Sequence, residues 1–274
     1  FIDKFYIIGF ALLIPTSINL SITQFLSPVL NAIMGRSDKP ELSISAFSIA
    51  VSILFLIALP NLRIQQLTIV YFKNFNKLKI HFFVILLSVI CLFVSLFIVF
   101  TPISEVFLKV IFATQGDLKL SVEKCLRIGF YIPFLLIIKM HLYAIAIVSS
   151  RSSLIWIGTI FGFCLTTILA FFLHYLGFEG YKIGMFSFTV SLLIETALIF
   201  FLTRKYFFDE EIIFEKEIFY VGDLFKFFLP LLFAAFIPAF TMPAINATLT
   251  RLDNPEVSIS AVNVGFGIFG AVTF

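Results

Sequence analysis

Residues 28–46 read PVLNAIMGRSDKPELSISA, and residues 243–261 read PAINATLTRLDNPEVSISA. Eleven of the nineteen positions are identical at a constant offset of 215 residues, including both prolines, the Arg-x-Asp pair and the final Ser-Ile-Ser-Ala run. In each copy an apolar segment precedes a charged elbow, and a second apolar segment follows it. We therefore interpret the stretch as a duplicated helix–elbow–helix unit, because self-similarity at a fixed offset indicates a repeated structural element.

The composition indicates whether this unit lies in water or in a lipid bilayer. Of the 274 residues, 61% are hydrophobic and 13% are charged, and the mean hydropathy is +1.10. An ordinary soluble domain has about 25% charged residues. These values predict an integral membrane protein, and an α-helical one, because each backbone polar group in lipid must be satisfied within its own segment or in a closed barrel. The small net charge of +3 gives no indication of a nucleic-acid partner.

Apolar segments long enough to cross a bilayer recur along the whole chain. We expect eight spans, at about 6–34, 42–59, 82–100, 128–148, 154–173, 183–202, 227–249 and from 257 to the end. Pro60 is expected to end the second span, and the basic stretch after it is expected at the cytoplasmic surface. Six crossings separate the two elbows, which predicts parallel repeats related by an axis along the membrane normal.

The repeat and the spans together predict the domain organisation. Residues 1–205 are expected to form a first six-helix lobe, 206–226 a cytoplasmic linker, and 227–274 the first two helices of a second lobe. The chain begins at Phe1 and stops inside an apolar segment, so we expect it to be part of a longer protein.

The first span carries a polar stripe. Ser17, Ser21, Gln24, Ser27 and Asn31 recur at steps of four, three, three and four residues, which places them on one helix face. Two interpretations stay open: these side chains bond to neighbouring helices, or they form one wall of a water-filled cavity. In the second copy Asn31 alone keeps its polar counterpart, Asn246, so the polar lining is weighted towards the first copy.

Three ionisable residues lie deep in predicted spans, namely Lys139, His141 and Glu195. Placing one such charged side chain at the membrane centre costs a free energy on the order of 2.5–3.5 kcal/mol, which favours a functional role. In one interpretation Lys139 and Glu195 form an ion pair whose only role is to lower the cost of burying both charges. In the other, Lys139 attracts an anionic substrate while His141 or Glu195 titrates during a transport cycle. The full candidate set for a substrate pathway is Gln24, Asn31, Asn61, Gln65, Lys139, His141, Ser191, Glu195 and Asn246.

Four patterns resemble one known superfamily. They are the P-x-x-N-A elbow with R-x-D-x-P-E, the L-P-x-x-x-x-Q-Q run at 59–66, the K-x-H-L run at 139–142, and the G-x-x-x-G…E-T pattern at 180–196. Together they look like the multidrug/oligosaccharidyl-lipid/polysaccharide (MOP) exporter superfamily, most of all its progressive ankylosis (ANK) group. The resemblance implies a MATE-like fold of two helical lobes with alternating access. It also implies that Lys139, His141 and Glu195 match a basic residue, a histidine and a glutamate of that group.

The expected function is therefore membrane transport. The resemblance implies export of a small polyanion such as pyrophosphate, citrate or a nucleotide, coupled to a proton or sodium ion. The alternatives are a lipid-linked saccharide flippase, a cation-coupled drug exporter, or a scaffold subunit that transports nothing. We expect a multi-pass protein of the cell membrane whose partners are the bilayer and a small-molecule or lipid-linked substrate. No enzyme motif is present, and neither a cofactor nor a metal site is expected, since Cys91, Cys125 and Cys164 are scattered in apolar text.

Overall fold

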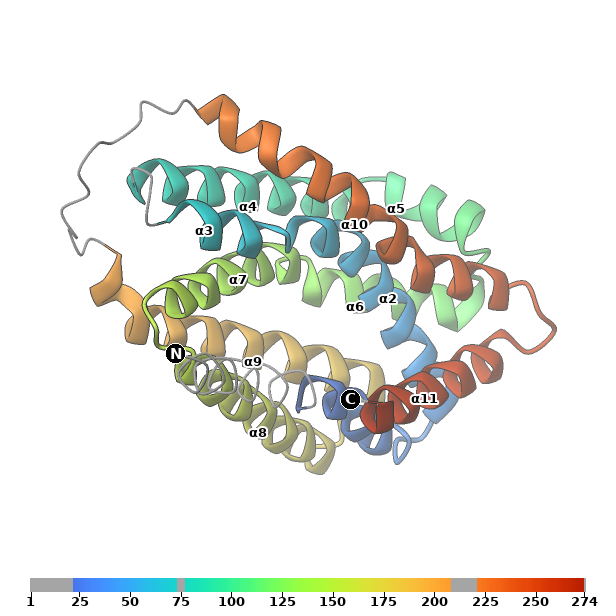
Figure 1. Ribbon diagram of the computed structural model, residues 1–274. Coiled ribbons are helices and arrows are strands. Elements are labelled where there is room, and N and C mark those ends of the chain that lie inside the picture. The colour runs from blue at the N-terminus through green and yellow to red at the C-terminus, as the bar shows by residue number, and fades with distance from the viewer. Residues whose placement is uncertain (1–21, 73–76, 208–220, 274) are drawn as a thin grey trace, which may run out of the picture.

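The computed structural model describes residues 22–72, 77–207 and 221–273, and every regular element within these ranges is helical. In chain order the elements are a first helix at Ile22–Met34, α2 (Pro40–Asn61), α3 (Ile64–Tyr71), α4 (Lys77–Phe100), α5 (Ile103–Val106), the π-helical turn η1 (Phe107–Ile111), α6 (Gly116–Gly129), α7 (Ile132–Val148), α8 (Ser153–Tyr175), α9 (Gly180–Thr203), the 3-10 turn η2 (Arg204–Tyr206), α10 (Val221–Leu249) and α11 (Pro255–Thr273). Figure 1 shows them as one helical bundle.

Five helical stretches of the described residues are long and apolar enough to cross a membrane: Pro40–Tyr71, Lys77–Phe100, Ser153–Tyr175, Gly180–Tyr206 and Gly222–Leu249. The pair α6 and α7, bent by 42° at its break, adds a sixth when it is counted as one span. On α4, Phe82, Phe93 and Phe97 are 59%, 64% and 59% exposed, which suits a surface that faces lipid rather than water. The chain is thus an all-α, multi-pass membrane protein.

Five of the eight predicted spans fall in these five stretches, and the span predicted at 128–148 falls in the bent pair α6 and α7. The described part of the first predicted span, Ile22–Met34, and the eighth, α11, are not among the stretches long and apolar enough to cross a membrane, so the described residues show fewer crossings than the eight predicted.

The sequence predicts that the second span ends at Pro60. This proline lies inside α2, and α3 follows so directly that Pro40–Tyr71 forms one 32-residue stretch. The helix itself ends at Asn61, as the sequence predicts, but the apolar stretch continues through α3. Pro60 falls in the last turn, and the N–H of Leu62 still bonds to the carbonyls of Ala58 and Leu59. The next residues are not a solvated surface, because Ile64 and Leu67 are fully buried.

Some sequence predictions fall outside the described residues. Only the part of the first span from Ile22 onwards is described, so Ser17 and Ser21 of the polar stripe lie outside. Most of the expected linker at 206–226 also lies outside.

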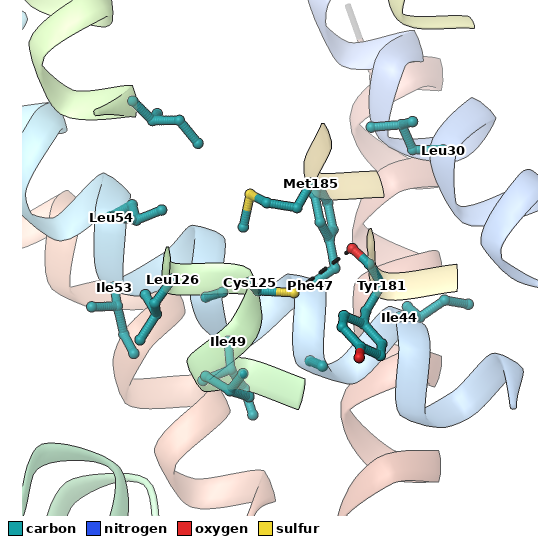
Figure 2. Close-up of a cluster of buried hydrophobic side chains, with 14 of the residues drawn as sticks. Leu30, Ile44, Phe47, Ile49, Ile53, Leu54, Cys125, Leu126, Tyr181 and Met185 are labelled. Carbon is teal, nitrogen blue, oxygen red and sulfur yellow. Dashed lines mark hydrogen bonds between the residues drawn. The ribbon is translucent and has the colours of Figure 1, made fainter. Parts of the chain in front are cut away.

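The main core forms where α2, α6 and α9 meet. Figure 2 shows Phe47 and Leu54 of α2, Leu126 of α6 and Met185 of α9 turned towards one another. The Cys125 thiol donates a hydrogen bond to the carbonyl of Tyr181 at 3.7 Å, which ties α6 to α9. This packing gives α2 and α9 fixed positions, and both helices contribute to the cavity described below.

Both elbows lie at the same end of the bundle. In the first, Lys39 pairs with Asp117 at 3.1 Å. In the second, Arg251 donates a hydrogen bond at 3.3 Å to the carbonyl of Val110. The first elbow therefore contacts the start of α6 and the second contacts η1, two elements that follow each other in the chain. The two helices of the second copy, α10 and α11, both pack against α2 of the first copy, as Figure 1 shows.

Candidate functional site

A cavity of about 560 Å³ lies between the two copies of the repeat. The first helix, α2 and one residue of α9 form one side of it, and α10 and α11 form the other. Its lining consists of Thr23, Gln24, Leu26, Ser27, Leu30, Phe47, Ser48, Val51, Ser52, Phe55, Leu59, Phe188, Pro238, Ala239, Met242, Pro243, Asn263, Phe266, Gly267, Phe269 and Gly270. The Gln24 face of the polar stripe thus borders an open space.

The lining follows the internal repeat. Fourteen of these residues form seven pairs separated by the 215-residue offset: Thr23/Pro238, Gln24/Ala239, Ser27/Met242, Ser48/Asn263, Val51/Phe266, Ser52/Gly267 and Phe55/Gly270. Equivalent positions of the two copies therefore face each other across the cavity. This is the arrangement that a pseudo-two-fold axis between two parallel repeats produces.

The duplicated asparagines join the two copies through matching hydrogen bonds. Asn263 on α11 donates to the amide oxygen of Asn31 at 3.4 Å. Asn246 on α10 donates to the backbone carbonyl of Ser48 on α2 at 3.3 Å and to the Ser52 hydroxyl at 3.2 Å. Asn31 corresponds to Asn246, and Ser48 corresponds to Asn263, so the two contacts are reciprocal. Both are longer than the usual value of about 2.9–3.0 Å, which makes this a weak connection between the copies.

The two sides of the cavity differ in polarity. The first copy contributes five polar side chains, Thr23, Gln24, Ser27, Ser48 and Ser52, whereas Asn263 is the polar side chain that the second copy adds to the described lining. Gly270 makes room for the longest of them, because a Cβ at position 270 would lie 2.9 Å from Oε1 of Gln24. This asymmetry matches the one predicted from the sequence.

A buried ion pair lies elsewhere, within the α7–α8–α9 part of the bundle. Lys139 Nζ on α7 is 2.7 Å from Glu195 Oε1 on α9, and the two side chains are 14% and 7% exposed. The Tyr143 hydroxyl donates a 2.6 Å hydrogen bond to the same carboxylate oxygen and lies 3.1 Å from the Thr159 hydroxyl of α8. Lys139 also lies 5.4 Å above the Tyr143 ring. The pairing expected from the sequence is therefore formed, and Tyr143 supports it.

Gly162 on α8 creates the space for this carboxylate. A Cβ at position 162 would collide with the Glu195 carboxylate, so α8 can pass close to α9 because that residue has no side chain. Further along α9, the hydroxyls of Ser187 and Ser191 are buried and have no hydrogen-bond partner. The α9 face with Ser187, Ser191 and Glu195 is thus polar over two turns.

His141 does not belong to this group, although it is two residues from Lys139. Its ring nitrogens lie 2.9 Å from the Thr68 hydroxyl on α3 and 2.8 Å from Nδ1 of His81 on α4. At such a distance one of the two facing ring nitrogens must carry the hydrogen. Sequence reasoning missed His81, because this histidine follows the lysines of the expected surface segment. Only the packing of α4 on α7 shows its role.

The remaining candidates lie away from the cavity. Asn61 donates to the Ile57 carbonyl of its own helix at 2.7 Å, and Gln65 is half-buried on α3. Neither belongs to the cavity lining. Of the candidates, Gln24 lines the cavity, while Asn31 and Asn246 lie behind the lining and hydrogen-bond to its residues. Lys139 and Glu195 form the ion pair, with Ser191 four residues before Glu195 on α9, and His141, Asn61 and Gln65 lie apart from both.

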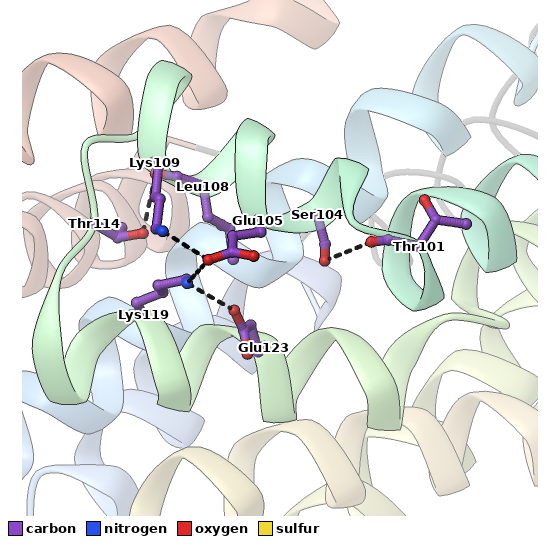
Figure 3. Close-up of polar contacts among 8 residues, drawn as sticks. All are labelled: Thr101, Ser104, Glu105, Leu108, Lys109, Thr114, Lys119 and Glu123. Atoms are coloured by element: carbon purple, nitrogen blue, oxygen red, sulfur yellow. Dashed lines mark hydrogen bonds and ion pairs between the residues drawn. The ribbon is translucent and has the colours of Figure 1, made fainter.

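Other polar groups form no centre of this kind. Glu105 of α5, Lys109 of η1, and Lys119 and Glu123 of α6 make a network of surface ion pairs, which Figure 3 shows. The described residues contain no group of three or more His, Cys, Asp or Glu side chains that would hold a metal ion. The three cysteines are free thiols.

No protein family, curated protein or solved structure matches this chain. Its function is therefore inferred from the cavity and the ion pair.

Proposed function

We propose that this chain is part of a membrane transporter, of the exporter or flippase type, that works by alternating access of two helical halves. The observation that carries the proposal is the cavity between the two copies of the repeat, lined by equivalent positions of each. Parallel repeats around a central site are a transporter architecture, because rocking one half against the other exposes the site to each side in turn.

The contacts between the copies suit such a movement. Asn246 on α10 makes hydrogen bonds of 3.2–3.4 Å to Ser48 and Ser52 of α2, and Asn263 on α11 makes one of 3.4 Å to Asn31 of the first helix, beside the packing of α10 and α11 on α2. These long hydrogen bonds are weak enough to be exchanged when one half rotates against the other. The amides that separate in one state meet new polar partners or water in the cavity. The two-lobe MATE-type arrangement of the MOP superfamily, in the cell membrane, is part of this proposal, supported by the repeated elbow and the shared end of both elbows.

The ion pair is the proposed coupling site. Glu195 is held by Lys139 and Tyr143 in a buried pocket, so a proton or sodium ion that reaches the carboxylate competes with the Lys139 ammonium. Release of Lys139 then changes how α7 packs on α9. The two buried hydroxyls of Ser187 and Ser191 supply neutral oxygen atoms on the same helix face.

Solvent access to the cavity tests the proposal. In a background where Cys91, Cys125 and Cys164 are replaced, Gln24→Cys is expected to react with a membrane-impermeant thiol reagent. Phe97→Cys on the lipid-facing side of α4 is the control and is expected to stay unreactive. A Gln24→Cys variant as silent as the control would reject transport in favour of a packed scaffold subunit.

A further inference from the structure

The chemistry of the cavity lining restricts what it can bind. None of its described lining residues is charged. The lining has five phenylalanines, namely Phe47, Phe55, Phe188, Phe266 and Phe269, and six side chains with a hydroxyl or an amide, namely Thr23, Gln24, Ser27, Ser48, Ser52 and Asn263.

Lys139 does not supply the missing positive charge. It is not part of the lining, and its ammonium group already contacts the Glu195 carboxylate at 2.7 Å. His141 is also absent from the lining and is held by Thr68 and His81. A polyanion that entered this cavity would lose water without gaining a cation, which is strongly unfavourable at low dielectric.

The polar and apolar groups are arranged for an amphipathic molecule. Five of the six neutral hydrogen-bonding side chains of the described lining lie on the first helix and α2, and only Asn263 lies on the opposite side, on α11. Phe266 and Phe269 on α11 give the opposite side its ring surfaces. The volume of about 560 Å³ falls within the range of about 300–1,000 Å³ that small-molecule sites occupy.

We propose that the cavity binds an uncharged amphipathic molecule, with an aromatic or aliphatic body and hydroxyl or amide groups on one edge. This inference rests on the proposed function, because it names the substrate class of the same cavity. The Gln24 carboxamide and the Ser27 hydroxyl on the first helix bind the polar edge, and the phenylalanine rings cover the body.

The test uses three probes with the same ring system and different charge: 2-naphthaleneethanol, 2-naphthaleneacetate and a naphthylethyl-trimethylammonium salt. Binding to the complete protein in nanodiscs is measured by equilibrium dialysis, with protein-free nanodiscs subtracted because all three probes enter lipid. Citrate and pyrophosphate are measured in the same way. The alcohol is expected to bind at least tenfold more tightly than either charged analogue, and citrate and pyrophosphate are expected not to bind.

Two matched variants on α11 place the binding in the cavity. Gly270→Val fills the space beside Gln24, whereas a side chain at Gly265 meets nothing within 4 Å. Gly270→Val is expected to weaken alcohol binding at least tenfold, and Gly265→Val to leave it unchanged. Gln24→Lys is expected to reverse the preference in favour of the carboxylate.

Two outcomes would overturn the inference, and they differ in what else they reject. If the carboxylate, citrate or pyrophosphate binds more tightly than the alcohol and Gly270→Val abolishes that binding, the substrate class is wrong while the transport cavity stands. If no probe binds and Gln24→Cys is also unreactive, the proposed function fails together with the inference.

Discussion

At the scale of single residues, the main feature of the molecule is the buried ion pair of Lys139 and Glu195. Lys139 and Glu195 tolerate the apolar interior because each neutralises the other and Tyr143 donates a third contact. Such a pair adds little net stability, since the desolvation of both groups offsets their attraction. Removal of one partner is different, because it leaves an unpaired ion. This difference separates a structural role of the pair from a coupling role.

We expect Lys139→Met to destabilise the protein by about 3–5 kcal/mol, because Glu195 then stays buried without its cation. The double variant Lys139→Met with Glu195→Leu is expected to recover stability and to lack transport. Thermal unfolding in detergent and uptake into proteoliposomes measure the two properties. Transport retained by the double variant would show that the pair is only structural.

Gly162 gives a second test at this scale. Gly162→Ala is expected to cost about 1–3 kcal/mol, since the new methyl group displaces the Glu195 carboxylate. Gly265→Ala on α11 is the matched control. It meets open space and is expected to stabilise its helix by up to about 1 kcal/mol. Opposite signs in thermal unfolding are predicted, and equal effects would contradict the close approach of α8 to α9.

At the scale of elements, two polar clusters hold helices in place. The first is the chain of Thr68, His141 and His81, which connects α3, α7 and α4. It is surrounded by rings, with Phe72 packed edge-on against both histidines. The second is the network around Glu105 of α5, which connects α5 to η1 through Lys109 and to α6 through Lys119. The first is buried and the second is exposed, so different measurements reveal them.

His141→Leu is expected to cost about 1–3 kcal/mol, because it removes two hydrogen bonds and places a leucine against Thr68 and His81. His174→Leu on α8 is the control: His174 is half-buried and is expected to change stability by less than about 0.5 kcal/mol. Hydrogen exchange of α3 amides checks that the loss is local. Unchanged exchange in α3 would argue against the histidine pair as a connection between helices.

The Glu105 network predicts a dependence on acid. Hydrogen bonds from Lys109 and Lys119 lower the pKa of Glu105 to about 2 from an ordinary value of 4.5. Its folded pKa is depressed, so its contribution to stability is complete above pH 4.5 and is lost as the pH falls towards 2. Comparison of Glu105→Gln with the parent by thermal unfolding between pH 2 and 7 is expected to show a difference that shrinks in acid. A difference that grows in acid would contradict the assignment.

At the scale of the whole molecule, the two copies of the repeat meet across the cavity. Asn31 and Asn263 touch at 3.4 Å, and Asn246 touches Ser48 at the equivalent position. If the halves move against each other during transport, at least one of these contacts must break. A covalent bond at this position therefore tests whether the movement occurs.

The double variant Asn31→Cys with Asn263→Cys, in the cysteine-replaced background, is expected to cross-link under mild oxidation and to stop transport. Reduction is expected to restore it. Asn31→Cys alone is the control, and it is expected to transport equally under both conditions. A cross-linked double variant that still transports would exclude movement of α11 against the first helix.

Local chemistry in the sequence determined a large part of this structure. The composition and the apolar runs predicted an all-helical membrane protein, because in lipid a segment must form its hydrogen bonds within itself and this requirement acts locally. The 215-residue offset predicted which positions are equivalent, and the depth of Lys139 and Glu195 in their spans predicted their pairing. Pro60 correctly predicted the end of α2 at Asn61, whereas the local pattern did not show that α3 continues the same apolar stretch.

Tertiary structure alone decided the sites themselves. His81 became the partner of His141, and Asn263 the partner of Asn31, through packing between helices that are 60 and 232 residues apart. The sequence pattern made both Lys139 and Gln24 candidates for a substrate pathway. Packing places Lys139 in an ion pair and Gln24 in the lining of a cavity whose described lining residues are all uncharged. Spacing along a helix fixes which face a residue lies on. What that face meets is set by the packing of the whole bundle, which no local pattern in the sequence records.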